Sequence, residues 1–330
     1  MESKIKWGIL STAAIATEHV IPAIINSEYG DVYAIASRSY DKAKSAAEKF
    51  NIPKYYGSYE DLLMDEEIDA IYNPLPNHLH VPCTIKCLEA GKHVLVEKPI
   101  GLRSAEAQKL VEESEKYSHL KVMEAFMYRH HPQWIKAKEL VESGVIGKVK
   151  TIQSFFAYVE DNPNSITNSK EYGGGSLMDI GCYPISLSRF IYNSEPEKVI
   201  ANIDYHPDYG VDISTTAIMK FKDGTSSFFS SIQVEDRQQA QIFGTKGKIE
   251  FQIPFNPIAD KSSKIFLDLN NKTEEIIFDP CDQYTIQADL FARAIIDDTD
   301  VPTPLADAVD NMKVIEKIIE SDKLGKQVNI

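Results

Sequence analysis

The sequence predicts an α/β fold, in which an N-terminal doubly wound parallel sheet precedes a C-terminal α+β domain with a large, mostly antiparallel open sheet. Residues 5–123 alternate between short apolar runs and helical patterns, which is typical of right-handed crossovers in a parallel sheet. From residue 149 the strand-like runs lengthen and alternate apolar with polar residues, which indicates antiparallel pairing. A chain of 330 residues exceeds the usual size of one core, so we expect two domains, 1–123 and 124–330.

In the first domain the expected strands are Lys6–Leu10, Val32–Ala36, Ala70–Tyr72, His93–Val96 and Val122–Met123. The expected helices are Thr17–Ser27, Asp41–Phe50, Tyr59–Met64, His80–Ala90 and Ser104–Tyr117. Strands and helices in such alternation imply a sheet that is covered on both faces.

The second domain opens with a helix from Met127 to about Ser143. The expected strands are Val149–Val159, Lys198–His206, Asp212–Phe221, Thr225–Gln233, Gln238–Phe243, Lys248–Gln252, Lys264–Asp268 and Thr273–Phe278. Two amphipathic, structural helices, Tyr284–Asp297 and Leu305–Asp322, close the chain. The exposed face of so large a sheet needs a cover, so we expect a homodimer or homotetramer that forms through it.

The composition opposes some classes of partner. With 35 basic and 49 acidic side chains the net charge is −14, which disfavours binding to nucleic acid or anionic lipid. The N-terminus leads directly into a strand-like run and no apolar segment reaches bilayer length, so we expect a cytoplasmic protein without membrane contact. The four cysteines form no Cys-x-x-Cys pair and no histidines cluster at zinc spacing, which indicates reduced thiols and no metal site.

The stretch Lys92–Pro99 is a short apolar run that ends in Glu97, Lys98 and Pro99. Proline cannot donate to a sheet ladder, so the strand should end before it. Lys98 is thereby placed at the carboxyl end of a buried strand, where open parallel sheets bind their ligands. The alternative is a solvated surface lysine, which is the default for a lone Lys.

The turn after the first strand reads Ser11-Thr12-Ala13-Ala14-Ile15-Ala16, where dinucleotide-binding domains carry Gly-x-Gly-x-x-Gly. Ser11, Ala13 and Ala16 replace the three glycines with other small residues. They still permit a close backbone approach, and the N–H groups at the helix start favour a pyrophosphate. The candidate cofactor contacts are Ser11, Thr12, Ala13 and Ile15. A tight connection without any ligand is the alternative.

The end of the second strand reads Ala36-Ser37-Arg38-Ser39, with no acid at its tip. NAD-binding domains usually place an Asp or Glu there for the ribose hydroxyls. A carboxylate would repel a 2'-phosphate, whereas the Arg38 guanidinium with the neighbouring Ser37 hydroxyl can bind one through charge-assisted hydrogen bonds. The sequence therefore favours NADP over NAD. The alternative is that Arg38 is only a solvated loop residue.

A loop with two prolines follows the strand at 70–72, and Asn77 and His80 flank the start of the next helix near the cofactor crevice. Asn77 could equally be only the helix cap. The candidate cofactor contacts in this region are Pro74, Leu75, Asn77, His80, Glu97 and Lys98.

Asp179 and Tyr183 are four residues apart and follow the run Gly173-Gly174-Gly175-Ser176. On a helix this spacing places a carboxylate and a phenol on the same face, so both could reach one substrate. The glycines let the helix begin close to another surface. A flexible loop before a helix with an ordinary tyrosine is the alternative. A carboxylate accepts hydrogen bonds from neighbouring hydroxyls, which favours a polyhydroxylated ligand, although Asp179 could instead only hold Tyr183 or Lys98.

The strand-end Glu-Lys-Pro and the pattern Gly-Gly-Gly-x-Leu-x-Asp-x-Gly-x-Tyr together resemble the glucose-fructose oxidoreductase, inositol dehydrogenase and rhizopine-catabolism family of nicotinamide-dependent enzymes. The resemblance covers nearly the whole chain. Ser11-Thr12-Ala13, Ala36-Ser37-Arg38 and Tyr183 are similar to the NADP-preferring branch that includes dimeric dihydrodiol dehydrogenase and D-xylose dehydrogenase. The resemblance implies a Rossmann domain at 1–123 and a domain for substrate binding and oligomerisation at 124–330.

The resemblance also implies residue roles. Lys98 would contact the substrate oxygen and the nicotinamide ribose, Tyr183 would donate or accept the proton, and Asp179 would orient the substrate. Tyr158 would join these three in binding the substrate. Arg129 and Tyr284 match family positions along the cofactor and near the nicotinamide. One departure is Asn164-Ser165-Ile166-Thr167, where related chains often carry Asn-Ile-Arg, so the family's substrates cannot be transferred safely.

These residues predict an NADP-dependent oxidoreductase that transfers hydride between the nicotinamide and a secondary alcohol, lactol or carbonyl of a sugar, sugar derivative or cyclic diol. The ammonium of Lys98 would favour the phenolate form of Tyr183. Two alternatives stay open: a non-catalytic NAD(P)-sensing regulator of the same fold, and a nicotinamide-dependent glycoside hydrolase. Net NADPH production from a sugar would argue against both.

Overall fold

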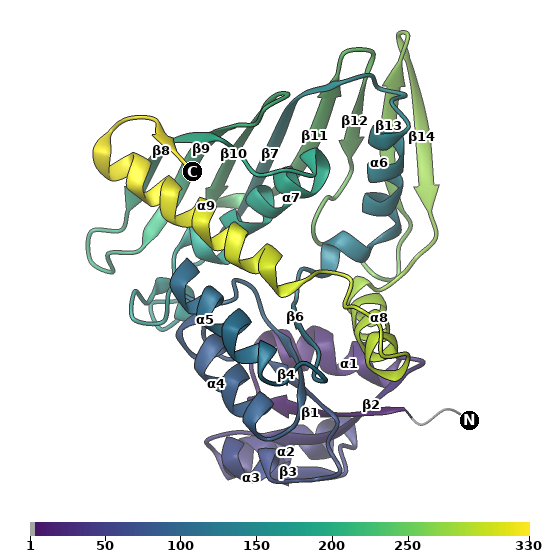
Figure 1. Ribbon diagram of the computed structural model, residues 1–330, viewed down its shortest axis with the longest axis vertical. Coiled ribbons are helices and arrows are strands. Elements are labelled where there is room, and N and C mark those ends of the chain that lie inside the picture. Colours follow the sequence, from purple (N-terminus) through teal and green to yellow (C-terminus); the bar gives the residue numbers. More distant parts are fainter. Residues whose placement is uncertain (1–3) are drawn as a thin grey trace. The chain divides into compact units, whose positions relative to one another are not determined.

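The computed structural model describes residues 4–330, and the chain divides into two compact units (Figure 1). One unit contains the described residues up to Met127 together with Asp282–Val309, and the other contains Tyr128–Cys281 and Asp310–Ile330. The expected division at residue 123 differs from this because the helix at 283–296 belongs to the first unit. An amphipathic pattern shows that a helix has a buried face, but it does not show which sheet that face covers.

The first unit is built on a parallel sheet that has six strands within the described residues, in the order β3-β2-β1-β4-β5-β6. The strands are β1 (Ile5–Leu10), β2 (Gly30–Ala36), β3 (Lys54–Tyr56), β4 (Ala70–Asn73), β5 (His93–Val96) and β6 (Val122–Glu124). All neighbours pair in parallel, and the strand order reverses beside β1. The doubly wound sheet is thus confirmed. β3 is absent from the sequence prediction because three half-buried residues show no strand pattern.

Helices cover both faces of this sheet. They are η1 (Ala16–Val20), α1 (Ile21–Ile25), α2 (Tyr40–Phe50), α3 (Tyr59–Leu63), α4 (Asn77–Glu89), α5 (Ser104–Glu115) and α8 (Gln283–Ile296). On one face Trp7 and Ile24 share a buried cluster with Phe291 of α8, and the Trp7 and Phe291 ring centroids lie 5.6 Å apart. On the other face Gly8 lies so close to α3 that a Cβ on it would be 2.9 Å from Leu62. The sheet is therefore buried on both sides, as its apolar strands require.

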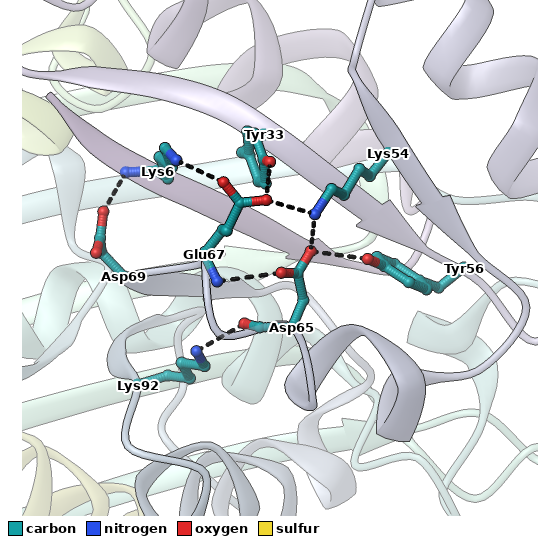
Figure 2. Close-up of polar contacts among 8 residues, drawn as sticks. All are labelled: Lys6, Tyr33, Lys54, Tyr56, Asp65, Glu67, Asp69 and Lys92. Atoms are coloured by element: carbon teal, nitrogen blue, oxygen red, sulfur yellow. Dashed lines mark hydrogen bonds and ion pairs between the residues drawn. The ribbon is translucent and has the colours of Figure 1, made fainter.

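A polar network closes the amino-terminal edge of this sheet (Figure 2). Lys54 Nζ lies 2.9 Å from Asp65 Oδ2 and 2.8 Å from Glu67 Oε2. Tyr33 donates its hydroxyl to Glu67 at 2.5 Å, and Tyr56 donates to Asp65 at 2.7 Å. The hydrogen bond from Lys54, followed by that from Tyr33, lowers the pKa of Glu67 to about 2. The network ties the loop before β4 to β2 and β3, at the edge opposite the carboxyl ends of the strands.

The second unit contains a sheet with nine strands in the described residues, in the order β14-β13-β12-β11-β7-β10-β9-β8-β15. The strands are β7 (Val149–Val159), β8 (Lys198–Tyr205), β9 (Asp212–Lys220), β10 (Thr225–Ser231), β11 (Gln233–Gly244), β12 (Gly247–Phe251), β13 (Ser263–Leu269), β14 (Lys272–Phe278) and β15 (Val328–Asn329). Pairing is antiparallel except between β7 and β10. The mostly antiparallel sheet is confirmed, with β15 as an added strand of two residues.

The remaining helices are η2 (Met127–His130), α6 (Pro132–Glu142), η3 (Ile166–Asn168), η4 (Leu177–Gly181), α7 (Cys182–Tyr192) and α9 (Leu305–Leu324). In the second unit α6, α7 and residues 310–324 of α9 lie over one face of the sheet (Figure 1). Asp322 fixes α9 there by accepting a hydrogen bond from the Ile203 N–H at 2.8 Å. On the other face Ile200 and Ile218 are paired across β8 and β9 and are 42% and 48% exposed.

Three wider features concern the described residues as a whole. Within residues 4–330, no helix has the length and apolar character that crossing a membrane requires. All four cysteines are thiols rather than disulfides. In the same range, no cluster of three or more His, Cys, Asp or Glu side chains has the arrangement of a metal site.

Candidate active site

The backbone after β1 keeps the shape of a glycine turn although no glycine is present. Ser11 has a φ of 82°, in the left-handed region that glycine adopts most readily. Its Oγ accepts a hydrogen bond from the Ala13 N–H at 3.2 Å, which stabilises this conformation locally. Ile15 stands at the N-cap position of η1 and packs against the buried cluster. A cofactor contact of Ile15 therefore stays a prediction.

A pocket of about 220 Å³ joins this turn to the end of β2. It is lined by Ser11, Thr12, Ala13, Ser37, Arg38, Ser39, Lys42 and Tyr59. The structure thus brings together five candidates that the sequence places about 25 residues apart, at the carboxyl ends of β1 and β2. Ser39, Lys42 and Tyr59 are additions that the motifs did not mark.

The pocket combines cationic side chains with a helix start. Ser39 caps α2 by accepting a hydrogen bond from the Lys42 N–H at 3.4 Å. Burial raises the pKa of the Tyr59 phenol, and the neighbouring Arg38 guanidinium lowers it in part. A lysine in the first turn of a helix opposes the helix dipole, and this anomaly is the signal that could have identified Lys42. Two cations, hydroxyls and helix N–H groups fit a phosphate monoester.

The loop after β4 is braced by the buried Asn73. Its amide donates to the His80 carbonyl at 3.1 Å and accepts from the Leu75 N–H at 3.3 Å. His80 is 1% exposed, and its Nδ1 donates to the Pro99 carbonyl at 2.7 Å. Burial lowers the pKa of His80 to about 4, so the ring is neutral. His80 here supports the backbone that follows Lys98, and its cofactor contact stays a prediction.

The first turn of α4 differs from the alternative in which Asn77 caps the helix. The helix begins at Asn77, and Pro76 occupies the N-cap position. The alternative in which Asn77 is the cap is therefore wrong, because the chain already has helical geometry at that residue. Pro74 and Leu75 lie in the loop after β4 and are buried, and their cofactor contacts stay a prediction.

Lys98 stands two residues after the last residue of β5, at the carboxyl end of the strand as expected, and it is half-buried. The neighbouring Glu97 is buried and accepts the Tyr72 hydroxyl at 2.7 Å. Tyr284 lies within electrostatic range of both: burial raises the pKa of its phenol, Glu97 adds to that shift and Lys98 opposes it. The ring of His19 stacks on Tyr284 with centroids 5.1 Å apart. The first unit therefore gathers Glu97, Lys98 and Tyr284, and neither Tyr72 nor His19 carries a motif that would have revealed it.

The second unit places Asp179 and Tyr183 on consecutive turns. Asp179 lies on η4, a π-helical turn, and Tyr183 lies on the first turn of α7. The expected helix is present, but its winding changes between the two residues. Tyr158 of β7 donates its hydroxyl to Asp179 Oδ2 at 2.6 Å. Tyr183 is 5% exposed. Its ring centroid lies 5.8, 5.5 and 5.4 Å from those of Tyr128, Phe156 and Phe255.

The glycine run lets the start of η4 approach other backbone closely, as expected. A Cβ on Gly174 would lie 2.2 Å from the Thr167 carbonyl oxygen. Gly175 has a φ of +106°, and a Cβ on it would lie 2.0 Å from Asp212 Oδ1. Only glycine fits at these two positions. Asp212 is a further addition, because no local pattern connects it with the glycines.

Arg129 belongs to the second unit and is buried there. Its Nε and Nη2 donate to Ser186 Oγ at 3.0 and 2.8 Å, and its guanidinium lies 5.6 Å from the Phe190 ring centroid. Both partners are on α7. Arg129 thus holds the helix that carries Tyr183, and its cofactor contact stays a prediction.

Comparison with known proteins assigns both units to one family. Residues 5–126 match an oxidoreductase family with an NAD-binding Rossmann fold, and residues 134–250 match the GFO/IDH/MocA C-terminal domain. The chain belongs to the GFO/IDH/MocA oxidoreductase family. This confirms the family expected from the Glu-Lys-Pro and glycine motifs.

Three known proteins illustrate the similarity. The chain is 34% identical over 326 residues to D-xylose 1-dehydrogenase (NADP+) 2 from Haloferax volcanii, covering 98% of this chain and 99% of the relative. It is 38% identical over 257 residues to a trans-1,2-dihydrobenzene-1,2-diol dehydrogenase from Xenopus tropicalis, covering 76% and 75%. The crystal structure of a 3-ketoreductase from Actinomadura kijaniata with NADP and TDP-benzene is similar with a TM-score of 0.91 and 26% identity, covering 97% and 98%.

Proposed function

We propose that the protein is an NADP-dependent dehydrogenase or reductase that acts on a secondary alcohol, lactol or carbonyl of a sugar, sugar derivative or cyclic diol. The observation that carries the choice of cofactor is the pocket at the end of β2, where Arg38 and Lys42 are present and none of the described lining residues is acidic. A 2'-phosphate gains charge-assisted hydrogen bonds at such a site. The xylose dehydrogenase relative is named for NADP, and the ketoreductase structure contains it.

Tyr183 serves as the acid/base group in this proposal. In oxidation its Oη takes the proton of the substrate hydroxyl, and in reduction it returns a proton to the carbonyl oxygen. Lys98 is its electrostatic partner, because an ammonium group stabilises the negative charge that develops on that oxygen. When bound, the nicotinamide accepts or supplies the hydride. The three aromatic rings around Tyr183 support this role, since they fix the direction of the phenol and keep water away.

Asp179 orients the substrate in this proposal. Tyr158 holds one of its carboxylate oxygens, which fixes the side chain in one direction. A carboxylate has about four acceptor positions, so Asp179 can also accept hydrogen bonds from neighbouring substrate hydroxyls. This arrangement supports a polyhydroxylated substrate, and the relatives named for D-xylose and for a 1,2-diol support the same class.

The deciding experiment incubates the purified protein with a panel of pentoses, hexoses and cyclic diols, with NADP and separately with NAD, and follows the absorbance of the reduced cofactor. We expect net NADPH formation from at least one compound, with a kcat/KM at least about tenfold higher for NADP. A cofactor sensor would form no NADPH, and a hydrolase would release product without net NADPH. A preference for NAD would contradict the role of Arg38.

We further propose that the protein works in the cytoplasm as a homodimer or homotetramer that forms through the open face of the large sheet. Ile200 and Ile218 are exposed on that face, and Phe155 and Phe229 stack at 4.9 Å on the neighbouring strands. The four thiols suit a reducing compartment. Ile218→Asp should convert the assembly to monomers in light scattering, whereas Met64→Asp, at an 80% exposed position of the first unit, should not. A monomeric wild-type protein would contradict this assembly.

A further inference from the structure

The first turn of the helix that carries Asp179 is capped by a neighbouring strand. Among the described residues, no side chain of η4 itself caps this end, and the hydroxyl of Ser176 donates to Ser230 Oγ at 2.9 Å instead. The Leu177 N–H donates to Asp212 Oδ2 at 2.6 Å. Asp212 is the first residue of β9, so the sheet supplies the missing hydrogen-bond acceptor.

The surrounding backbone is shaped around this carboxylate. Gly175 leaves room for Asp212 Oδ1, since a Cβ there would lie 2.0 Å from it. The Thr215 hydroxyl donates to Asp212 Oδ2 at 3.2 Å, which holds the carboxylate from the strand side. Both oxygens of Asp212 are therefore enclosed, one by the glycine turn and one by two donors.

We propose that Asp212 is a positioning residue, whose carboxylate fixes the first turn of η4 and thereby the place and direction of Asp179 and Tyr183. The inference rests on the proposed function, in which these two side chains meet the substrate. Leu177 stands two residues before Asp179 and six before Tyr183, so a shift of its N–H is passed along one continuous helix. A displacement of about 1 Å at a reacting group can lower a rate about 100-fold.

Stability alone does not account for an aspartate at this position. Asp212 is 9% exposed, and burial raises the pKa of its carboxyl to about 6, with a further contribution from the charge of Asp179. The folded protein therefore disfavours the ionised form that is present at neutral pH. An asparagine would accept the same N–H without a buried charge. The ionised group is the stronger acceptor, and it holds the turn more firmly.

The test compares Asp212→Ala and Asp212→Asn with a matched control. Asp204→Ala removes a carboxylate from β8 of the same sheet, where it is exposed and accepts the Ser214 hydroxyl at 2.9 Å. With the sugar that the wild type oxidises, we expect Asp212→Ala to lower kcat about tenfold or more. We expect Asp212→Asn to stay within about threefold of the wild type, because its amide oxygen keeps the acceptor. The Kd for NADPH should not change in any variant.

The readouts separate positioning from a purely structural role. In Asp212→Asn, kcat should fall slightly while Tm at pH 8 stays equal or rises, and a structural residue would lower both together. A kcat of Asp212→Ala within twofold of the wild type would overturn the proposal. Loss of the fold in both Asp212 variants would also overturn it, because Asp212 would then stabilise the unit rather than place the helix.

A measurement without substrate keeps this inference distinct from the proposed function. Hydrogen exchange of the amides in residues 175–183 should be faster in Asp212→Ala than in the wild type and in Asp204→Ala. If the wild type oxidises no sugar, the proposed function fails, and this measurement still decides whether Asp212 anchors the turn. Unchanged exchange in Asp212→Ala would show that it does not.

Discussion

Tyr158 and Asp179 are joined by a 2.6 Å hydrogen bond that runs from β7 to η4. β7 pairs with β10 on one side and β11 on the other, so the Tyr158 hydroxyl is attached to a central strand of the large sheet. Asp179 is thus held directly by Tyr158, while Asp212 holds the backbone two residues before it. The carboxylate that we assign to substrate orientation is fixed from two strands.

Tyr158→Phe should lower kcat/KM for a polyhydroxylated substrate about tenfold, because a hydrogen bond to a charged group contributes about 1.5–3 kcal/mol. The Kd for NADPH should stay the same. Steady-state kinetics measure the first quantity and fluorescence titration the second. Tyr205→Phe is the control, since its phenol lies beside Asp322 of α9 instead. An unchanged kcat/KM would remove Tyr158 from the site.

Tyr183→Phe should lower kcat by several orders of magnitude and leave NADPH binding nearly intact, because the variant keeps the ring but loses the proton-transferring oxygen. Tyr192→Phe on the same helix is the matched control, since its hydroxyl donates to the Thr225 carbonyl at 2.8 Å. Single-turnover kinetics and a binding titration test both expectations. Weak NADPH binding with normal turnover would contradict the assignment.

Arg38→Ala should raise KM for NADP about 10- to 100-fold and leave KM for NAD nearly unchanged, because the proposed partner of the guanidinium is the 2'-phosphate, which NAD lacks. Lys42→Ala should act in the same direction. Lys49→Ala changes a lysine in the last turn of the same helix and serves as the control. Kinetics with both cofactors measure the ratio. An equal loss for NAD and NADP would mean that these cations bind another part of the cofactor.

Acid should weaken the first unit through the network in Figure 2. The hydrogen bond from Lys54 lowers the pKa of Glu67 from 4.5 to about 2. The stabilising contribution of Glu67 is therefore complete above about pH 4.5 and is lost as the pH falls toward 2. Glu67→Gln should lower the urea midpoint at pH 7 and reduce its further fall between pH 5 and 3. Glu48→Gln, which removes a 3.9 Å pair with Lys44, should follow the wild type.

Asp212 should show the opposite pH dependence. Burial raises its pKa from 3.8 to about 6, so the folded state binds the proton more tightly than the unfolded state. Its contribution to stability therefore falls as the pH rises from about 4 to about 6. Asp212→Asn should be more stable than the wild type at pH 7, by on the order of 1–3 kcal/mol, and the difference should vanish near pH 4. If the difference in stability between Asp212→Asn and the wild type stayed constant from pH 4 to pH 7, it would come from packing and not from the charge of Asp212.

The sequence was sufficient for most of the fold because the period of its apolar residues changes where the architecture changes. The sequence did not predict β3 and β15, because strands of three and two residues are too short to show a periodic pattern of apolar residues. The sequence also did not predict that α8 packs in the first unit, for another reason. Its pattern shows the buried face, whereas its place beside Trp7 depends on how the chain returns after the second sheet.

The candidate site likewise contains residues that the sequence marks and residues that it does not. Lys98, Asp179 and Tyr183 are candidates that the sequence marks because each belongs to a contiguous motif. Lys42 was not marked, although its place in the first turn of a helix is a local signal. Asp212 was not marked because its partner comes from another element: its carboxylate accepts an N–H that lies 35 residues away in the chain. Local sequence patterns identify the residues that a reaction needs, but the residues that hold them in place depend on tertiary pairing.

The parallel pairing of β7 with β10 requires a long connection between them. Thr225, at the start of β10, pairs with Thr151 near the start of β7, so residues 160–224 must return along the length of the strands. This connection carries Asp179, Tyr183 and Asp212, and it also supplies β8 and β9 to the same sheet. Substitutions and insertions in its turns can therefore adapt the site to new substrates while its strands stay in the sheet.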